Sequence, residues 1–384
     1  MIYLDNHATT ACDPRVVAAM LPYFSTNYGN PGSPHALGQQ AAEAVARARE
    51  QVAALLKAEA AEIVFTSGAT EANNLAIIGA ALQHESAGGT RRRIVTSVIE
   101  HKSVLEPCEY LATRGWEVIR LPVDSHGFVQ WDHAERLIDE STLLVTLQAA
   151  NSEIGTIQDI RSMAKLAHRH GALLHCDAAQ AVGKISMNIF DWPVDLLSLS
   201  AHKFYGPKGV GALYIRGGGE DQALTPLMRG GSQEYGLRPG TVPVPLIVGM
   251  GVAAEVAGNE LTIEQQRIWL LRDRLEKEIL KAIPTATVNG DLKHRLPHNS
   301  SITFRGVEAE ALMANLSTVA LSTGAACESG SLDPSRVLLA IGRTHDDAFC
   351  TVRMGLGRFT TVEEAQRASK EIIDAVQFLR TLLA

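Results

Sequence analysis

The sequence lacks the cysteine pattern of a disulfide scaffold or a zinc domain. Its 384 residues include five cysteines, an odd number that is widely scattered and contains no CxxC pair: Cys12, Cys108, Cys176, Cys327 and Cys350. Both kinds of architecture need cysteines that are paired or closely spaced. Any cysteine with a function is therefore expected to act singly, and no metal site is predicted.

The chain also lacks an excess of positive charge, a long apolar run and a recognisable leader segment. Its formal net charge is −7, and the only short cationic run covers residues 91–93, which argues against a nucleic-acid partner. We find no stretch of about 18 apolar residues and no basic, apolar leader in the opening MIYLDNHATT. We therefore expect no membrane partner and a cytoplasmic protein.

The apolar content is high enough for a sizeable core, and its distribution predicts an α/β fold. Hydrophobic residues make up 46% of the chain. Short apolar runs such as EIVFTSG and TLLVTLQ alternate with helical patterns between residues 60 and 215, as in βαβ units whose mostly parallel sheet is covered on both faces. A long helix, a few strands and a final amphipathic helix follow residue 258. We predict a large α/β domain at 14–258 and a smaller α+β domain at 1–13 and 259–384, although the sequence alone would allow the N-terminal segment to pack with either domain.

Polar residues follow five of the predicted strands. They are Ser67 to Thr70, His101, Asn151, Asp177, and Ser200 to Lys203. Ligands of such sheets bind beyond the carboxyl ends of the strands. We therefore expect these five strand ends to converge on one crevice.

Three of these groups match the needs of one cofactor. In TSGATEANN a strand passes through small residues into a helix, whose N-terminus attracts a phosphate, although Thr70 could instead only cap that helix. Asp177 needs a cation, which could also come from a structural ion pair. With Lys203 as the amine that forms a Schiff base, these groups predict pyridoxal 5'-phosphate.

An ordered set of motifs along the chain then resembles a known family. The motifs are LDNHATT, SGATEANN, IEHKSV, HCDAAQ, SAHKFYGPKGVGALY, LRPGT, STGAACESGS and VRMGLGRFT. Together they resemble the NifS/IscS-like cysteine desulfurases, in the class V branch of fold-type I pyridoxal-phosphate enzymes. The resemblance implies that L-cysteine yields L-alanine and a persulfide on Cys327. A sulfur-acceptor protein would take that sulfur for iron–sulfur clusters, thio-cofactors, or tRNA or DNA modification.

The resemblance also implies a role for each matching position. Lys203 would hold the cofactor and move the substrate's α-proton, His101 would stack on the ring and shuttle protons, and Arg353 would clamp the substrate carboxylate, with Arg358 as a rival. Thr241 would reach the phosphate of the other subunit, which makes a homodimer part of the site. The remaining cofactor contacts would come from Ala69, Thr70, Asn151, Ser152, Asp177, Gln180, Ser200 and His202, with Asn151 also near the substrate.

Cys327 lies among small residues that favour a mobile loop, unlike Cys108, Cys176 and Cys350, which we interpret as core residues. A thiol with a pKa near ~8.5 is mostly protonated at neutral pH, so it needs a base. His101 and the substrate are the candidates. Two positions depart from the family pattern: Ser152 stands where a second asparagine is usual, and Glu328 follows Cys327 where a small hydroxyl residue is more common.

Two alternatives remain at this stage. One is another class V enzyme, such as an aminotransferase, a lyase or a selenocysteine lyase, for which Cys327 would be dispensable. The other is a sulfur-relay or assembly component that mainly binds partners and has little turnover of its own. The sequence does not identify the acceptor.

Overall fold

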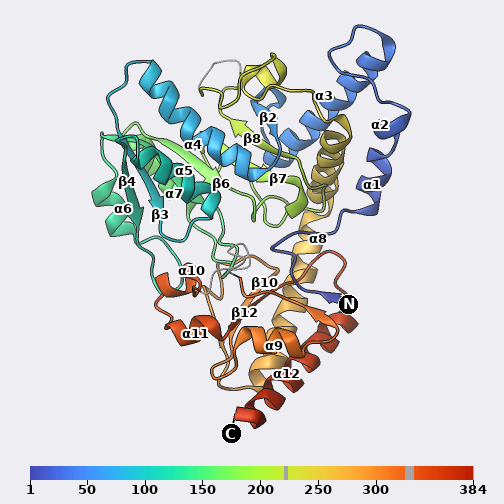
Figure 1. Ribbon diagram of the computed structural model, residues 1–384, viewed down its shortest axis with the longest axis vertical. Helices are drawn as coiled ribbons and strands as arrows, with labels where there is room; N and C mark the ends of the chain where they lie inside the picture. The colour runs from blue at the N-terminus through green and yellow to red at the C-terminus, as the bar shows by residue number, and fades with distance from the viewer. Residues whose placement is uncertain (220–223, 325–332, 384) are drawn as a thin grey trace.

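The computed structural model describes residues 1–219, 224–324 and 333–383 (Figure 1). Its largest element is a seven-stranded sheet in the order β2-β8-β7-β6-β5-β3-β4. Strand β8 runs antiparallel to both neighbours, and all other neighbouring pairs are parallel. The strands, in sheet order, are Ile63–Thr66, Gly211–Ile215, Leu196–Ser200, Leu173–Asp177, Thr142–Gln148, Arg93–Ser97 and Glu117–Leu121. The predicted mostly parallel α/β sheet is confirmed.

This strand order brings the predicted strand ends together. Because β2 and β7 are each antiparallel to β8, they point in the same direction as β6, β5 and β3. The carboxyl ends of these five strands therefore share one edge of the sheet.

Helices cover both faces of the sheet, which explains why its central strands are apolar throughout. On one face, strand residues such as Val64 and Ile94 pack against α4 (Ala69–Ser86) and α5 (Lys102–Ala112). On the other, Phe65 and Val145 join a cluster with α3 (Ala36–Leu56), α7 (Ile160–Arg169) and the first part of α8 (Val244–Ala282). The shorter helices of this region are α1 (Pro14–Met20), α2 (Pro22–Ser25) and α6 (Trp131–Leu137).

A second, smaller region carries its own core. Its sheet has the antiparallel order β12-β10-β9, and β1 pairs with β11 beside it. These strands are Thr351–Gly355, Asn299–Thr303, Thr287–Val288, Ile2–Tyr3 and Val319–Ala320. The helices are α9 (Ala309–Asn315), α10 (Arg336–Ala340), α11 (His345–Phe349) and α12 (Val362–Leu383).

The predicted domain boundary at residue 258 falls inside α8, which begins at Val244 and crosses both regions in Figure 1. The division stays a prediction, but the packing follows it. Residues of α8 up to Ala257 belong to the core of the large region, whereas those from Ile268 belong to the core of the small region. Ile2 and Leu4 also lie in the small core, because β1 pairs with β11 there.

Helix α8 departs from the expectation that the chain has no membrane-length apolar run. Among the described residues, this one helix is long and apolar enough to cross a membrane, and half of its apolar window is buried inside the protein. A buried core helix passes the same test of length and composition, so this is weak evidence for a span.

Arg358 joins the two regions where α8 passes between them. Its side chain is 8% exposed and forms ion pairs of 2.9 Å with Asp13 and 2.7 Å with Glu264. Its guanidinium carbon also lies 4.2 Å from the centre of the Tyr205 ring. Removing one member of such a buried cluster leaves carboxylates desolvated without their partner.

We therefore expect Arg358→Ala to lower the free energy of unfolding by about 3 kcal/mol. The matched control is Arg274→Ala, because the side chains of the Arg274–Glu278 pair on α8 are 51% and 36% exposed, and such a pair should contribute less than about 0.5 kcal/mol. Urea unfolding of both variants measures the difference. Equal losses would show that the Arg358 cluster does not hold the regions together.

Candidate active site

A cavity of about 460 Å³ lies at the shared carboxyl edge of the sheet, within the size range of small-molecule sites. Most of the predicted site residues line it: Ala69, Thr70, His101, Ser152, Asp177, Gln180, Ser200, His202 and Lys203. Asn151, Thr241 and Arg353 do not line it. Cys327 and Glu328 lie outside the described residues.

The N-terminus of α4 forms one wall of the cavity. Strand β2 ends at Thr66, and α4 begins at Ala69 with Gly68 as its N-cap, at φ 155°, and with no side-chain cap. Thr70 lies inside the first turn, so the alternative that it caps the helix is wrong. The uncapped N–H groups and the helix dipole suit an anion. Gly68 is needed because the backbone here adopts a conformation open mainly to glycine.

Lys203 ends the short 3₁₀ turn Ala201–Lys203, which directly follows β7. Its Nζ donates to the carbonyl oxygens of His7, at 2.5 Å, and Ala8, at 2.9 Å. Two residues later, Tyr205 has the left-handed φ of 68°, and its N–H donates to Thr10 Oγ1. The N-terminal segment therefore fixes both the amine and the turn that presents it.

Asp177 ends β6 and is 7% exposed. One carboxylate oxygen accepts a hydrogen bond from Asn73 Nδ2, at 2.9 Å, and the other accepts from the N–H of Ala179, at 3.0 Å. No ion pair to Asp177 is seen among the described residues, which removes the structural ion pair as its explanation there. A buried carboxylate on a cavity wall suits a cationic group of a bound molecule.

His101 and His202 line the cavity from the ends of β3 and β7. His101 is the N-cap of α5, where its Nδ1 accepts from the N–H of Ser103 at 3.1 Å, so it is both a helix-start residue and a cavity residue. Burial lowers the pKa of His202 to about 4, so its ring is neutral at pH 7. Burial also raises the pKa of Glu100, which precedes His101, to about 8.

Gln180 is held by His7, which stands in the motif LDNHATT but for which no role was predicted. His7 Nδ1 lies 3.0 Å from Gln180 Oε1, and Gln180 Nε2 donates to the His7 carbonyl at 3.1 Å. Burial and nearby positive charges lower the pKa of His7 well below its usual value, so the ring is neutral. The sequence could not predict the contact between His7 and Gln180, because 173 residues separate the two along the chain.

Asn151 was predicted to contact the cofactor and the substrate, but it does not line the cavity. Its Oδ1 accepts from the N–H groups of Glu153 and Ile154, and its Nδ2 donates to the carbonyl of Ile99. The amide is engaged in closing the turn after β5, and the side chain is buried. Ser152, the next residue, faces the cavity instead.

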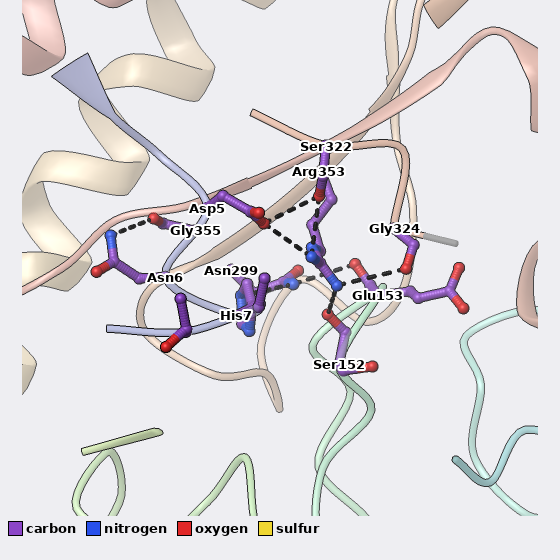
Figure 2. Close-up of polar contacts among 12 residues, drawn as sticks. Asp5, Asn6, His7, Ser152, Glu153, Asn299, Ser322, Gly324, Arg353 and Gly355 are labelled. Carbon is purple, nitrogen blue, oxygen red and sulfur yellow. Dashed lines mark hydrogen bonds and ion pairs between the residues drawn. The ribbon is translucent and has the colours of Figure 1, made fainter. Parts of the chain in front are cut away.

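Arg353 on β12 is tied to the loop that carries Ser152 (Figure 2). Its Nη2 donates to Asp5 at 2.8 Å and to Ser322 at 2.9 Å, and its Nη1 donates to the Ser152 carbonyl at 3.2 Å. The Asp5 carboxylate offsets the buried charge. The rival Arg358 is likewise held by ion pairs, in a separate cluster with Asp13 and Glu264.

Thr241 is exposed and follows Arg238, whose Nε donates to Glu71 in the first turn of α4 at 3.1 Å. The RPGT segment is thus anchored beside the start of that helix. Ser67 and Gly68, within the predicted strand end, also line the cavity, and the residues there that were not predicted are Ala8, Thr9, Ser103, Gln148, Ala150, Ala179, Lys208 and Gly209. Ala8 and Thr9 stand within the motif LDNHATT, which was the only sequence signal for them.

The chain matches known proteins along nearly its whole length. The family model described as Aminotransferase class-V matches residues 2–368. "Cysteine desulfurase IscS" of Rickettsia typhi is 44% identical over 382 residues, which cover 99% of this chain and 92% of that protein. A solved "NIFS-LIKE PROTEIN" superposes with a TM-score of 0.90 at 37% identity, covering 98% of this chain and 99% of that one.

A third match is the solved structure titled "SspA in complex with cysteine". It superposes with a TM-score of 0.81 at 35% identity, and the match covers 94% of this chain and 100% of that chain. The resemblance drawn from the ordered motifs is thereby confirmed over the full fold. The chain belongs to the class-V aminotransferase family, and the relative and the NifS-like structure that it matches place it beside the cysteine desulfurases.

Proposed function

We propose that this protein is a pyridoxal-phosphate-dependent cysteine desulfurase, a sulfurtransferase that converts L-cysteine to L-alanine and keeps the sulfur as a persulfide on Cys327. The observation that carries the proposal is the convergence on one cavity of the Lys203 amine, the buried Asp177 carboxylate and the N-terminus of α4. Relatives that bear the name cysteine desulfurase and are about 44% identical over the whole chain support it.

The residues present fit the cofactor. The cavity holds an uncapped helix N-terminus for the phosphate, with Ser200 and His202 beside it, and a buried carboxylate that lacks an ion pair among the described residues for the ring nitrogen. Gln180 is the candidate for the ring hydroxyl, and Lys203 supplies the amine. Pyridoxal phosphate, when bound, provides an electron sink for bond cleavage at the substrate's α-carbon.

The chain's own groups then position the substrate and move protons. Lys203, oriented by two backbone carbonyls, is the base for the α-proton. Asp177 would hold the ring nitrogen, where a carboxylate favours a positive charge. Arg353 supplies the planar donors for the substrate carboxylate from behind the Ser152 loop.

The sulfur step balances without an added oxidant. A new bond forms between the sulfur of Cys327 and the sulfur of the substrate while the substrate's carbon–sulfur bond breaks. The electron pair stays with the carbon, which takes up a proton and leaves as L-alanine. One thiol and one L-cysteine thus give one persulfide and one L-alanine. The part played by Cys327 rests on the resemblance, because that residue lies outside the described residues.

The quaternary structure and the partners belong to the same proposal. Thr241 is exposed and lies three residues after Arg238, which binds Glu71 at the start of α4; this position supports a homodimer in which Thr241 contacts the partner's cofactor. A sulfur-acceptor protein then removes the persulfide sulfur, and the site of action is the cytoplasm.

Product analysis tests this function against that of an aminotransferase. With L-cysteine and dithiothreitol but no 2-oxo acid, we expect L-alanine and sulfide in equal amounts over many turnovers. An aminotransferase would instead need a 2-oxo acid and would leave the sulfur on the carbon chain. Turnover only with an added 2-oxo acid would refute the proposal, and no turnover would favour the relay alternative.

Arg353→Lys is expected to raise the KM for L-cysteine about tenfold or more, with a smaller change in kcat, because a charged bidentate contact is lost. A lysine at this position cannot contact Asp5 and the Ser152 loop together. Steady-state kinetics measure the split between KM and kcat. The control is Arg274→Lys, on the exposed face of α8, and an unchanged KM for Arg353→Lys would remove Arg353 from the substrate site.

A further inference from the structure

A chain of hydrogen bonds connects Asp177 to His101 behind the cavity wall. Asn73 of α4 donates from Nδ2 to Asp177 Oδ2, at 2.9 Å, and to Ser103 Oγ, at 2.8 Å. Ser103 Oγ lies 2.8 Å from His101 Nδ1. Asn73 is fully buried, and Ser103 and Asp177 are 8% and 7% exposed. Three elements, α4, α5 and β6, therefore meet in one network, which is desolvated from Asp177 to Ser103 and ends at the exposed His101.

The direction of every hydrogen in this chain is fixed by chemistry. An ionised carboxylate only accepts, so Asn73 must face Asp177 with its amide nitrogen, and its second hydrogen points to Ser103 Oγ. The hydroxyl hydrogen of Ser103 is then left for His101 Nδ1. The backbone N–H of Ser103, which can only donate, points to the same nitrogen at 3.1 Å.

These two donors determine the tautomer of His101. A ring nitrogen that accepts hydrogen bonds carries no proton, so the neutral imidazole holds its proton on Nε2. The Oδ1 atom of Asn73 is buried with no hydrogen-bond partner among the described residues, an arrangement that costs free energy. The orientation of the Asn73 amide therefore satisfies both of its N–H donors, whereas its oxygen accepts no hydrogen bond from the described residues.

We propose that Asn73 is a positioning residue of this active site: its amide holds Asp177 in place and orients the Ser103 hydroxyl, which together with the Ser103 N–H keeps His101 in the Nε2–H tautomer. The inference rests on the proposed function for the roles of Asp177 and His101. With its proton on Nε2, His101 offers a hydrogen-bond donor and not an acceptor from that ring nitrogen.

The first test reads the tautomer directly by NMR. Protein labelled with ¹⁵N-histidine is examined without cofactor at pH 8, and His101 is assigned from the signal lost in His101→Gln. We expect an unprotonated, hydrogen-bonded Nδ1 and a protonated Nε2. In Ser103→Ala, Asn73→Ala and Asn73→Asp, the Nδ1 resonance should move toward that of a nitrogen with fewer hydrogen bonds. A protonated Nδ1 in the unaltered protein, or an Nδ1 resonance unmoved in both Asn73 variants, overturns the proposal.

The second test separates the two arms of the network in the holoenzyme. Release of pyridoxal phosphate, followed by its visible absorbance, should accelerate about tenfold in the Asn73 variants, because Asp177 loses a charge-assisted hydrogen bond. Ser103→Ala should leave release within about twofold, since the bond between Asn73 and Asp177 survives. Unchanged release in the Asn73 variants overturns the proposal.

Two further variants guard the interpretation. Asn74→Ala is the matched control, because Asn74 neighbours Asn73 on α4 but donates to the Thr70 carbonyl of its own helix, and it should change neither readout. Asn73→Asp keeps the side chain's volume if Asn73→Ala fails to fold. If no cofactor binds at all, the proposed function fails, while the NMR result still decides the network on its own.

Discussion

Replacing Lys203 by alanine is expected to lower the turnover of L-cysteine by about 10⁴-fold, because the variant loses both the amine that holds the cofactor and the base for the α-proton. The amine is directed by the carbonyls of His7 and Ala8, so no neighbouring group replaces it at the same position. Alanine formation under saturating L-cysteine measures the rate. The protein should also lose the absorbance of covalently held cofactor.

Lys208 offers the matched control for Lys203. It lines the same cavity but is exposed and lies beyond the turn at Tyr205. Lys208→Ala should therefore lower turnover by less than about tenfold, since it removes a nearby charge and not a reacting group. Comparable losses in the two variants, or a Lys203→Ala protein that retains covalently bound cofactor, would contradict the assignment.

Asp177→Asn should lower kcat on the order of 10²-fold, because a buried charge is then missing opposite the ring nitrogen. The substitution keeps the shape of the side chain but not its hydrogen bonding. Asp177 accepts from Asn73 on one oxygen and from Ala179 on the other, whereas an asparagine offers one acceptor and one donor. One of the two neighbours then faces a donor, so we also expect the free energy of unfolding to fall by about 1–3 kcal/mol.

One control variant, Asn73→Ala, separates the catalytic loss of Asp177→Asn from its structural loss. Asn73→Ala also removes a hydrogen bond at Asp177 but leaves the charge in place, so it should cost stability with a smaller loss of kcat. Urea unfolding and steady-state kinetics of both variants give the comparison. If Asp177→Asn is destabilised but retains kcat, the carboxylate is structural and does not act on the cofactor.

The large sheet and the cavity were predictable because their signals are local. Apolar strands followed by polar residues gave the strand ends, and the parallel order placed Thr70, Asp177 and Lys203 at one edge. The confirmed core positions of Cys108 and Cys176 follow from the same local reasoning. Pattern and turn chemistry act over a few residues, which a single sequence displays directly.

The features that were missed depend on contacts between distant parts of the chain. No local pattern shows that His7 holds Gln180, or that Asn73 of α4 reaches Ser103 of α5 and Asp177 of β6. Asn151 differs, because the contacts that engage it are local: its Oδ1 accepts from the N–H groups of Glu153 and Ile154 in its own turn. The sequence did not predict that α8 continues through the boundary at residue 258. The apolar pattern changes there because the two halves of the helix pack against different cores.

Mass spectrometry of the purified protein after brief mixing with L-cysteine tests the central claim most directly. The account predicts a peptide containing Cys327 that is heavier by about 32 Da, the mass of one added sulfur, and that returns to its original mass with dithiothreitol. The same peptide in Lys203→Ala should stay unmodified. A protein that forms alanine while this peptide remains unchanged, or that carries the extra sulfur equally well in Lys203→Ala, would contradict it.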